Sequence, residues 1–475
     1  MRSFVSRSFL IFAITLSGCA SIVPSSGSRT LANFAPQASL SERNPVIVIH
    51  GTLGSKLVDD QTGRVIWGAF GRPAANPSLP SGARSTALPM APGVPLSQLR
   101  DSVRSDGALE AFEVTAFRFP LEIRSYTQIL KSLDAGGYRH QVSSQNNDAV
   151  LGDDYPTCFQ FDFDWRRDIS ENAVRLHEFI GEKRAYVEEQ RRLRGRATEG
   201  VKFNIVAHSM GGLLTRYYLR YGAQPLPDDG SLPNITWDGC QCVEQAILIG
   251  TPNAGSALAF LNLLKGTSIG PLLPKYAPAL VGTMPAIYQL LPRSRHGVLV
   301  DAADHNHQLD IFDPQLWHAM QWGLASPNQD WILRMLLPTV SDRNSRFAIA
   351  LDHQSKCLMR AGQFHAAIDI PASPPSGLSL HLFAGDSIMT DAVLAVDLQT
   401  GKTNPIQKAP GDGVTTFASA AALESLSNAS PQFVSTIAWK TLLRPRADHL
   451  GLTQDTVFTR NILPLLEPQA NPAQP

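Results

Sequence analysis

The amino-acid sequence predicts an α/β protein whose core is a mostly parallel sheet flanked by helices. Continuous apolar runs of strand length, such as residues 45–50 and 203–207, are typical of strands buried on both faces. Amphipathic helical patterns lie between such runs, and the clearest spans residues 172–192. Strands that alternate with helices indicate βαβ units and a parallel sheet. No period of about 20–50 residues recurs, which excludes a repeat protein.

The elements follow from local pattern in chain order. The first strand ends at Gly51, and helical spacing over residues 126–133 stops at Gly136 and Gly137. The other expected elements are strands at residues 159–165, 244–249 and 378–384, a hairpin around Thr400 and Gly401, a helix over 213–221 and a C-terminal helix from about 453 to 463.

Two segments depart from this alternation. Residues 71–98 are rich in Pro, Ala and Ser, which predicts an irregular excursion. Residues 256–345 have little strand character and many Leu, Ile, Pro and Trp residues, so we interpret them as a helical cap inserted over one end of the sheet. Plain core helices are the alternative. One domain over residues 44–466 and a disordered tail over 467–475 complete this organisation.

Composition excludes several classes of protein. The 475 residues include 41 Lys+Arg and 41 Asp+Glu, so a nucleic-acid binder with a basic excess is not expected. Hydrophobic residues make up 43% and charged residues 17%, against the roughly 25% charged residues of typical soluble domains. A disordered chain would show the opposite balance. The sequence therefore predicts a globular protein with a large core and a lightly charged surface.

The N-terminus predicts export and lipidation. Arg2 and Arg7 precede an apolar run at residues 9–16 that is too short to span a bilayer. The sequence then reads Leu-Ser-Gly-Cys up to Cys19, which resembles the bacterial lipobox. The resemblance implies a signal peptide over residues 1–18, a lipidated Cys19 and, because Ala20 follows, the outer membrane. The segment from Cys19 to residue 43 is rich in Ser, Ala and Pro with few charges, which predicts a flexible tether. An ordinary signal peptide with a chance cysteine is the alternative.

The remaining cysteines are Cys158, Cys240, Cys242 and Cys357. In an exported chain these thiols form structural disulfides or stay buried. One C-x-C pair and two isolated cysteines do not match zinc-ligand spacing. Acidic and histidine side chains over residues 301–310 also suggest a cation site, but a solvated loop is the preferred interpretation. We expect neither metal nor cofactor.

The chemistry centres on Ser209. An apolar strand precedes this residue and a helix follows it, which is the context of a nucleophile elbow. Ala207 and Gly211 supply the small neighbours that the tight turn requires, although Ala207 replaces the usual glycine. A serine that only caps a helix is the alternative.

A serine nucleophile needs a base and an acid that orients it. In α/β hydrolases the chain order is Ser, then acid, then His, so His449 is the expected base. Asp386 directly follows one strand, and Asp412 lies in a Gly-Asp-Gly turn after the hairpin. Both remain candidates for the acid, with Asp412 preferred.

An oxyanion needs backbone donors. One is expected from the amide of Met210, and the other from the loop at residues 50–54. His50 in that loop is interpreted as a structural turn residue rather than a second base.

Taken together, these segments resemble the lecithin–cholesterol acyltransferase group, which includes lysosomal phospholipase A2 and the phospholipid:diacylglycerol acyltransferases. The resemblance implies an α/β-hydrolase fold, Asp412 as the acid and Thr52 as the second oxyanion donor. The departures are His50, Thr52, Ala207 and the 71–98 excursion. The segments that carry the resemblance are residues 45–57, 126–138, 163–166, 207–212, 250–256, 284–292, 411–415 and the segment around His449.

The expected function is that of a serine acyl hydrolase or O-acyltransferase acting on a lipid ester, with phospholipase A-type activity included. The same triad also serves a short-chain carboxylesterase, a thioesterase or a polyester depolymerase. A lipid-binding lipoprotein with an inactive hydrolase fold is the alternative outside enzymes.

Overall fold

The computed structural model describes residues 43–70, 74–109, 111–116, 119–124, 126–141, 155–268, 274–425 and 433–467. The expected signal peptide, Cys19, nearly all of the tether and residues 468–475 lie outside these ranges.

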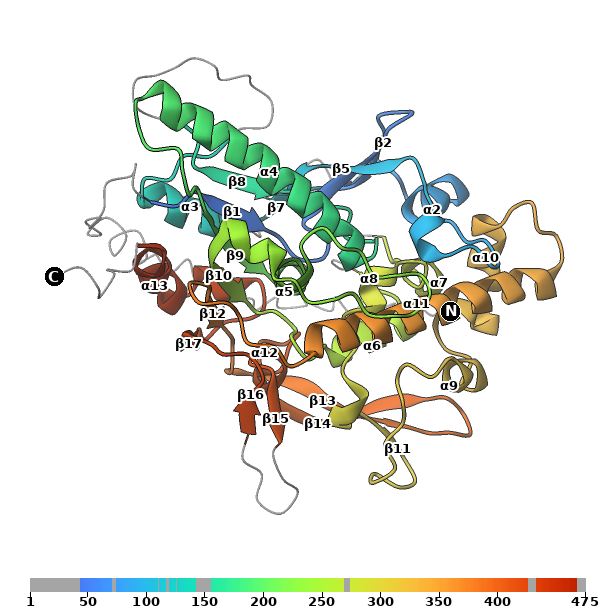
Figure 1. Ribbon diagram of the computed structural model, residues 1–475. Coiled ribbons are helices and arrows are strands. Elements are labelled where there is room, and N and C mark those ends of the chain that lie inside the picture. The colour runs from blue at the N-terminus through green and yellow to red at the C-terminus, as the bar shows by residue number, and fades with distance from the viewer. Residues whose placement is uncertain are drawn as a thin grey trace, which may run out of the picture.

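A parallel sheet forms the centre of the fold, as the sequence predicts (Figure 1). It has six strands, of which the edge strand at Thr441–Leu443 was not predicted. Its strand order is β17-β12-β10-β9-β1-β8, and every pairing between neighbours is parallel. Fully buried, largely apolar strands such as β1 and β9 lie in its interior. The strands are β1 (Val46–Ile49), β8 (Cys158–Phe161), β9 (Phe203–His208), β10 (Val243–Ile249), β12 (Ser379–Phe383) and β17 (Thr441–Leu443).

Helices cover both faces of this sheet. Val48, Val206 and Ile247 pack with one helix pair, and Ile47 and Ile205 belong to the larger core on the other face. The first face holds α3 (Thr127–Ala135) and α13 (Thr456–Leu466), and the second holds α4 (Ile169–Leu193) and α5 (Met210–Tyr221). This arrangement is an α/β-hydrolase fold.

The end of β8 differs from the prediction. The strand stops at Phe161 rather than at residue 165 because the next residues form a turn. The Asp164 carboxylate accepts hydrogen bonds from the backbone amide and the guanidinium of Arg166, at 3.1 and 2.9 Å. Asp168 then caps α4 by accepting from the amide of Ser170.

The segment expected to be irregular contains a helix. Within residues 74–98, α2 (Pro80–Thr86) begins with a proline at its first position, where no backbone donor is needed. The preceding segment supplies two strands to a small sheet that the sequence did not reveal. This sheet consists of β2 (Ser55–Asp59), β3 (Val65–Trp67) and β5 (Val103–Ala108); another small sheet contains β4 (Ala69–Phe70), β6 (Ala111–Ala116) and β7 (Phe119–Arg124).

The stretch between β10 and β12 is mostly helical and occupies the right half of Figure 1 together with α2. Its longest element, α11 (Arg343–Asp369), was not predicted. One short strand, β11 (Leu299–Asp301), pairs with the hairpin that turns near Thr400. The other helices between β10 and β12 are α6 (Ala257–Lys265), α7 (Pro278–Val281), α8 (Pro285–Tyr288), η3 (Ser294–His296), α9 (Pro314–Ala319), η4 (Gly323–Ala325), η5 (Pro327–Gln329) and α10 (Asp330–Leu336).

After β12 the chain forms β13 (Ile388–Val396), β14 (Thr403–Gly411), α12 (Phe417–Ala420), β15 (Leu423–Ser425), β16 (Phe433–Ser435) and η6 (Gly451–Gln454).

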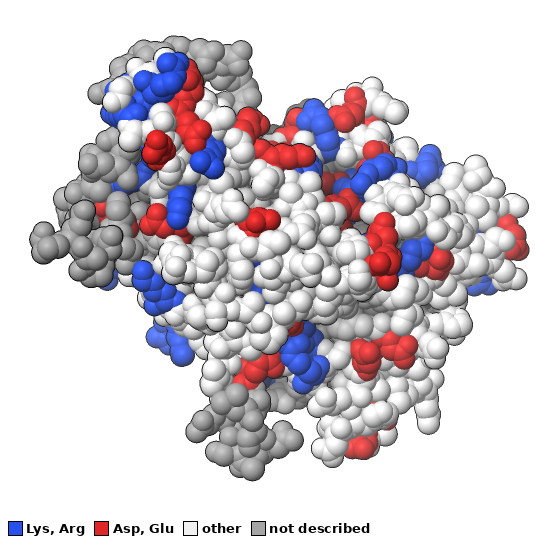
Figure 2. Space-filling model, in the orientation of Figure 1, with Lys and Arg blue, Asp and Glu red and all other residues white. Residues whose placement is uncertain are grey.

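The four described cysteines are free thiols, and three of them are buried. No helix within the described ranges combines the length and the apolar character needed to cross a bilayer. Figure 2 shows acidic and basic side chains intermingled on one face, with broad areas that carry neither.

Candidate functional site

Ser209 occupies a strained turn at the carboxyl end of the sheet. It lies between the end of β9 and the start of α5 with φ 54° and ψ −124°, a conformation that few non-glycine residues adopt. A Cβ on Gly211 would lie 2.4 Å from the carbonyl oxygen of His50, and one on Gly212 would lie 1.9 Å from Thr251 Oγ1. Glycine is therefore required at both positions, and the turn presents the serine as a nucleophile elbow does.

In the structure, two consecutive hydrogen bonds connect Ser209, His449 and Asp412. His449 Nε2 lies 2.9 Å from Ser209 Oγ, and His449 Nδ1 lies 2.8 Å from Asp412 Oδ2. With Nδ1–H donating to the carboxylate, Nε2 is free to accept the serine proton.

Asp412 is held firmly. Its Oδ1 accepts the amide protons of Val414 and Thr415 at 3.0 and 2.7 Å, so Oδ2 is left for His449. Burial raises the pKa of the Asp412 carboxyl, but the charge of His449 and these hydrogen bonds outweigh it and hold the pKa below its usual range. The rival candidate Asp386 instead pairs with Arg444 at 3.3 Å.

The two residues expected to supply oxyanion donors adjoin each other. Thr52 Oγ1 lies 3.8 Å from the sulfur of Met210, and Met210 opens α5, where backbone amides lack helical partners. A Cβ on Gly51 would lie 2.7 Å from Ser209 Cβ, so the loop backbone passes directly beside the serine.

His50 serves as a buried structural residue. Its Nδ1–H donates to the carbonyl of Gly51 at 2.7 Å, its Nε2 accepts from the Ser55 hydroxyl, and its ring stacks on Phe163 with centroids 4.4 Å apart. Burial lowers the pKa of His50 to about 4, so the ring is neutral at pH 7.

A second buried histidine was missed by the sequence reasoning. His208 Nε2 lies 3.0 Å from the carbonyl oxygen of His449, and His208 Nδ1 lies 3.3 Å from the hydroxyl of Tyr126. The signal available in the sequence was its position immediately before Ser209.

Two cavities are lined by residues close in sequence to the expected site residues. A small cavity of about 70 Å³ adjoins the loop at Thr52 and has a mainly apolar wall that includes Trp67, Tyr276, Met284 and Ile287. The cavity thus lies beside Thr52, one of the two residues expected to supply oxyanion donors.

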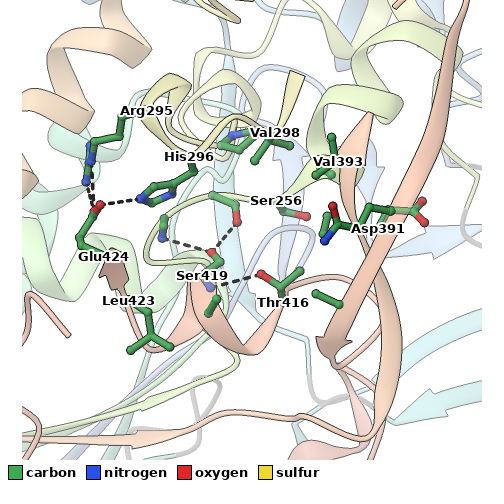
Figure 3. A pocket seen from close by; sticks show the side chains of 18 of the residues that line it. Ser256, Arg295, His296, Val298, Asp391, Val393, Thr416, Ser419, Leu423 and Glu424 are labelled. Carbon is green, nitrogen blue, oxygen red and sulfur yellow. Dashed lines mark hydrogen bonds and ion pairs between the residues drawn. The ribbon is translucent and has the colours of Figure 1, made fainter. Parts of the chain in front are cut away.

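The larger of the two cavities, of about 600 Å³, is lined in part by Thr416 and Ser419, which follow Asp412 in the chain. Figure 3 shows Arg295 and His296 pointing toward Glu424 at one end. Ser256 in its wall donates to the carbonyl of Val414, which connects the cavity to the Asp412 loop.

The segment at residues 301–310 does not gather into a metal site. His307 Nδ1 lies 3.6 Å from Asp301, and within the described ranges no group of three or more His, Cys, Asp or Glu side chains is placed to hold an ion.

Comparisons with known proteins agree with this architecture. The sequence model described as "Lecithin:cholesterol acyltransferase" matches residues 102–322. No curated protein sequence matches the chain.

Solved structures give a likeness of fold. The Tle4–Tli4 complex aligns with a TM-score of 0.54 and 14% identity, over 88% of this chain and 97% of that chain. Mature lipase BlEst2 of Bacillus licheniformis aligns with a TM-score of 0.34 and 12% identity, over 91% and 96%. Phospholipase PlaB of Legionella pneumophila aligns with a TM-score of 0.30 and 13% identity, over 70% and 60%. Of these three, the first exceeds a TM-score of 0.5 and indicates a shared fold.

The central sheet and its helices identify the fold. The similarity to the family rests on the matched segment, which contains β9, Ser209 and α5. Residues 102–322 of this chain are therefore similar to the lecithin:cholesterol acyltransferase family, and this similarity supports an acyl ester hydrolase or acyltransferase of α/β-hydrolase fold.

Proposed function

We propose that the protein is a serine acyl hydrolase or O-acyltransferase that acts on lipid esters through Ser209, His449 and Asp412. The observation that carries this proposal is the continuous hydrogen-bonded line from Ser209 Oγ to the Asp412 carboxylate, built on the strained elbow. An inactive lipid-binding protein has no need of a serine held at positive φ against a base.

The reaction follows from these contacts. Ser209 Oγ attacks the ester carbonyl while its proton passes to His449 Nε2, and Asp412 stabilises the imidazolium and fixes its orientation. The amides of Thr52 and Met210 donate to the oxyanion. Collapse of the tetrahedral intermediate expels the alcohol, which takes the proton from His449 and leaves an acyl-enzyme on Ser209. Water then releases a fatty acid, or an acceptor alcohol takes the acyl group.

The nature of the acyl chain is the finer part of the proposal. The family favours a long-chain lipid ester, and the apolar wall at Trp67, Met284 and Ile287 suits a hydrocarbon chain. The cavity measures about 70 Å³, which favours a short-chain carboxylesterase as the second candidate.

We also propose that a lipid on Cys19 anchors the enzyme to a bacterial outer membrane. The lipobox-like sequence before Cys19 and the Ser-, Ala- and Pro-rich segment that follows support this. Metabolic labelling with a clickable palmitate analogue should mark the wild-type protein and leave Cys19→Ser unmarked. Equal labelling of both would contradict the anchor.

The test of the activity compares wild type with Ser209→Ala on p-nitrophenyl esters of increasing chain length and on phospholipid vesicles. Loss of the nucleophile should lower kcat by roughly three to six orders of magnitude. Retention of the wild-type rate would contradict the proposal. A preference for vesicles over short esters separates the lipid-ester candidate from the short-chain esterase.

A further inference from the structure

Tyr126 and His208 join the two halves of the site through one hydrogen-bonded chain. The amide of Gly51 donates to the Tyr126 hydroxyl oxygen at 2.9 Å. The Tyr126 hydroxyl lies 3.3 Å from His208 Nδ1, and His208 Nε2 lies 3.0 Å from the carbonyl oxygen of His449. The chain therefore begins beside Thr52 and ends on the backbone of the expected base.

A single arrangement of protons satisfies this chain. The carbonyl of His449 can only accept, so His208 Nε2 carries the hydrogen. Nδ1 of the neutral ring then accepts from the Tyr126 hydroxyl, whose oxygen in turn accepts from Gly51. Each group acts in the one role open to it, and the direction of donation runs without a break from Gly51 to His449.

Burial keeps this arrangement fixed. His208 is 2% exposed and Tyr126 is 4% exposed. Burial and the neighbouring charge of His449 lower the pKa of His208 to about 3, and burial raises the pKa of Tyr126 to about 12. The charged or titratable groups that bear on His208 are His449, Asp412 and His50, together with the Tyr126 hydroxyl. Both members of the chain thus stay neutral across the working pH range of a serine hydrolase.

Both ends of this hydrogen-bonded chain lie in loops of the structure. Gly51 follows β1 and His449 lies in the loop before η6, so the Tyr126–His208 pair connects two loops rather than two strands. The His208 ring also contacts the His449 ring, with centroids 4.8 Å apart. A shift at either end alters the position of the base relative to the oxyanion donors.

We propose that Tyr126 and His208 are positioning residues that fix the separation between the oxyanion loop and the base His449. This inference rests on the proposed function, because it assigns a role within the same site. Tyr126 holds the Gly51 amide, and through it the loop that presents Thr52. His208 holds the His449 backbone, and through it the imidazole that faces Ser209.

The expected result is a loss in kcat with little change in KM. Displacement of reacting groups by about 1 Å costs on the order of 10²-fold, so Tyr126→Phe and His208→Leu should each lower kcat by about 10- to 100-fold. The carboxamide of a glutamine reaches about as far as Nε2, so His208→Gln should keep the bond to His449 and recover most of the loss. His208→Asn reaches only as far as Nδ1 and should not.

A double-mutant cycle separates positioning from general destabilisation. Because both residues act through one chain, the Tyr126→Phe, His208→Leu double variant should lose no more than about threefold beyond the worse single variant. A matched control is His365→Leu, which removes a buried histidine whose Nε2 bonds the carbonyl of Gln289 at 2.8 Å, away from the triad. It should lower thermal stability and leave kcat unchanged.

The measurements for each variant are kcat and KM from steady-state hydrolysis, the acylation rate from the p-nitrophenol burst, and the thermal midpoint. Wild-type kcat in Tyr126→Phe, or a double variant whose losses multiply, would overturn the role of the chain while Ser209→Ala remains inactive. An active Ser209→Ala variant would instead overturn the proposed function, and the positioning role would fall with it.

Discussion

Asp412→Asn provides a quantitative test of how the acid orients the base. In the wild-type site, Asp412 Oδ1 accepts two backbone amide protons and Oδ2 accepts from His449 Nδ1. The carbonyl oxygen of an asparagine must take the Oδ1 position, because only an acceptor satisfies two donors. The NH₂ group then faces Nδ1 and forces the imidazole into the tautomer with Nε2–H toward Ser209.

That tautomer cannot accept the serine proton. The same exchange in a Ser-His-Asp hydrolase lowers kcat by about 10⁴-fold. We expect a loss of about 10³- to 10⁴-fold, equivalent to about 4–5.5 kcal/mol of transition-state stabilisation. Steady-state hydrolysis of p-nitrophenyl butyrate measures it. Asp386→Asn is the matched control, because its carboxylate pairs with Arg444 at the surface and should be dispensable. A folded Asp412→Asn variant that loses less than about tenfold, or an Asp386→Asn variant that loses as much, would refute this reasoning.

Three further predictions concern the elbow, the oxyanion loop and acid stability. Gly212→Ala places a Cβ 1.9 Å from Thr251 Oγ1, and this overpacking should lower the free energy of unfolding in urea by about 1–3 kcal/mol. An unchanged free energy of unfolding would contradict the described packing. Thr52→Ala keeps the backbone amide and removes only a weak contact between the Thr52 hydroxyl and the Met210 sulfur. We therefore expect kcat to change by less than about tenfold. A larger loss of kcat would assign the hydroxyl a role in the reaction. Burial lowers the pKa of His50 to about 4 and of His208 to about 3, so between pH 6.5 and 4 the unfolded chain takes up protons that the folded chain does not. Stability should therefore fall as pH falls through this window, by about 1.4 kcal/mol per pH unit for each histidine; urea midpoints that stay constant from pH 7 to pH 5 would contradict it.

The parallel sheet was predictable because its central strands are buried on both faces. Apolar runs such as β1 and β9 carry that burial directly in their residues. The elements that were missed lack such a signal. α11 mixes charged and apolar residues over 27 positions. The β2–β3–β5 sheet depends in part on a long-range pairing, in which Leu57 of β2 lies opposite Ser105 of β5.

The candidate site was likewise predictable only in part from the sequence. Ser209 and Asp412 lie in short local patterns that dictate tight turns, and His449 followed from chain order. The choice between Asp386 and Asp412 could not be made from the residues alone, since both follow plausible elements. The Tyr126–His208 chain was also beyond reach, because it joins residues 82 positions apart through side chains whose direction only the fold sets.

The most direct test of the central claim is the location of a covalent adduct. The purified protein should react with a fluorophosphonate probe in a one-to-one ratio, and mass spectrometry of the digested protein should place the adduct on Ser209. Asp386→Asn should react at the wild-type rate, and Asp412→Asn should react far more slowly. Absence of an adduct, or an adduct on a serine other than Ser209, would contradict the assignment of Ser209 as an activated nucleophile.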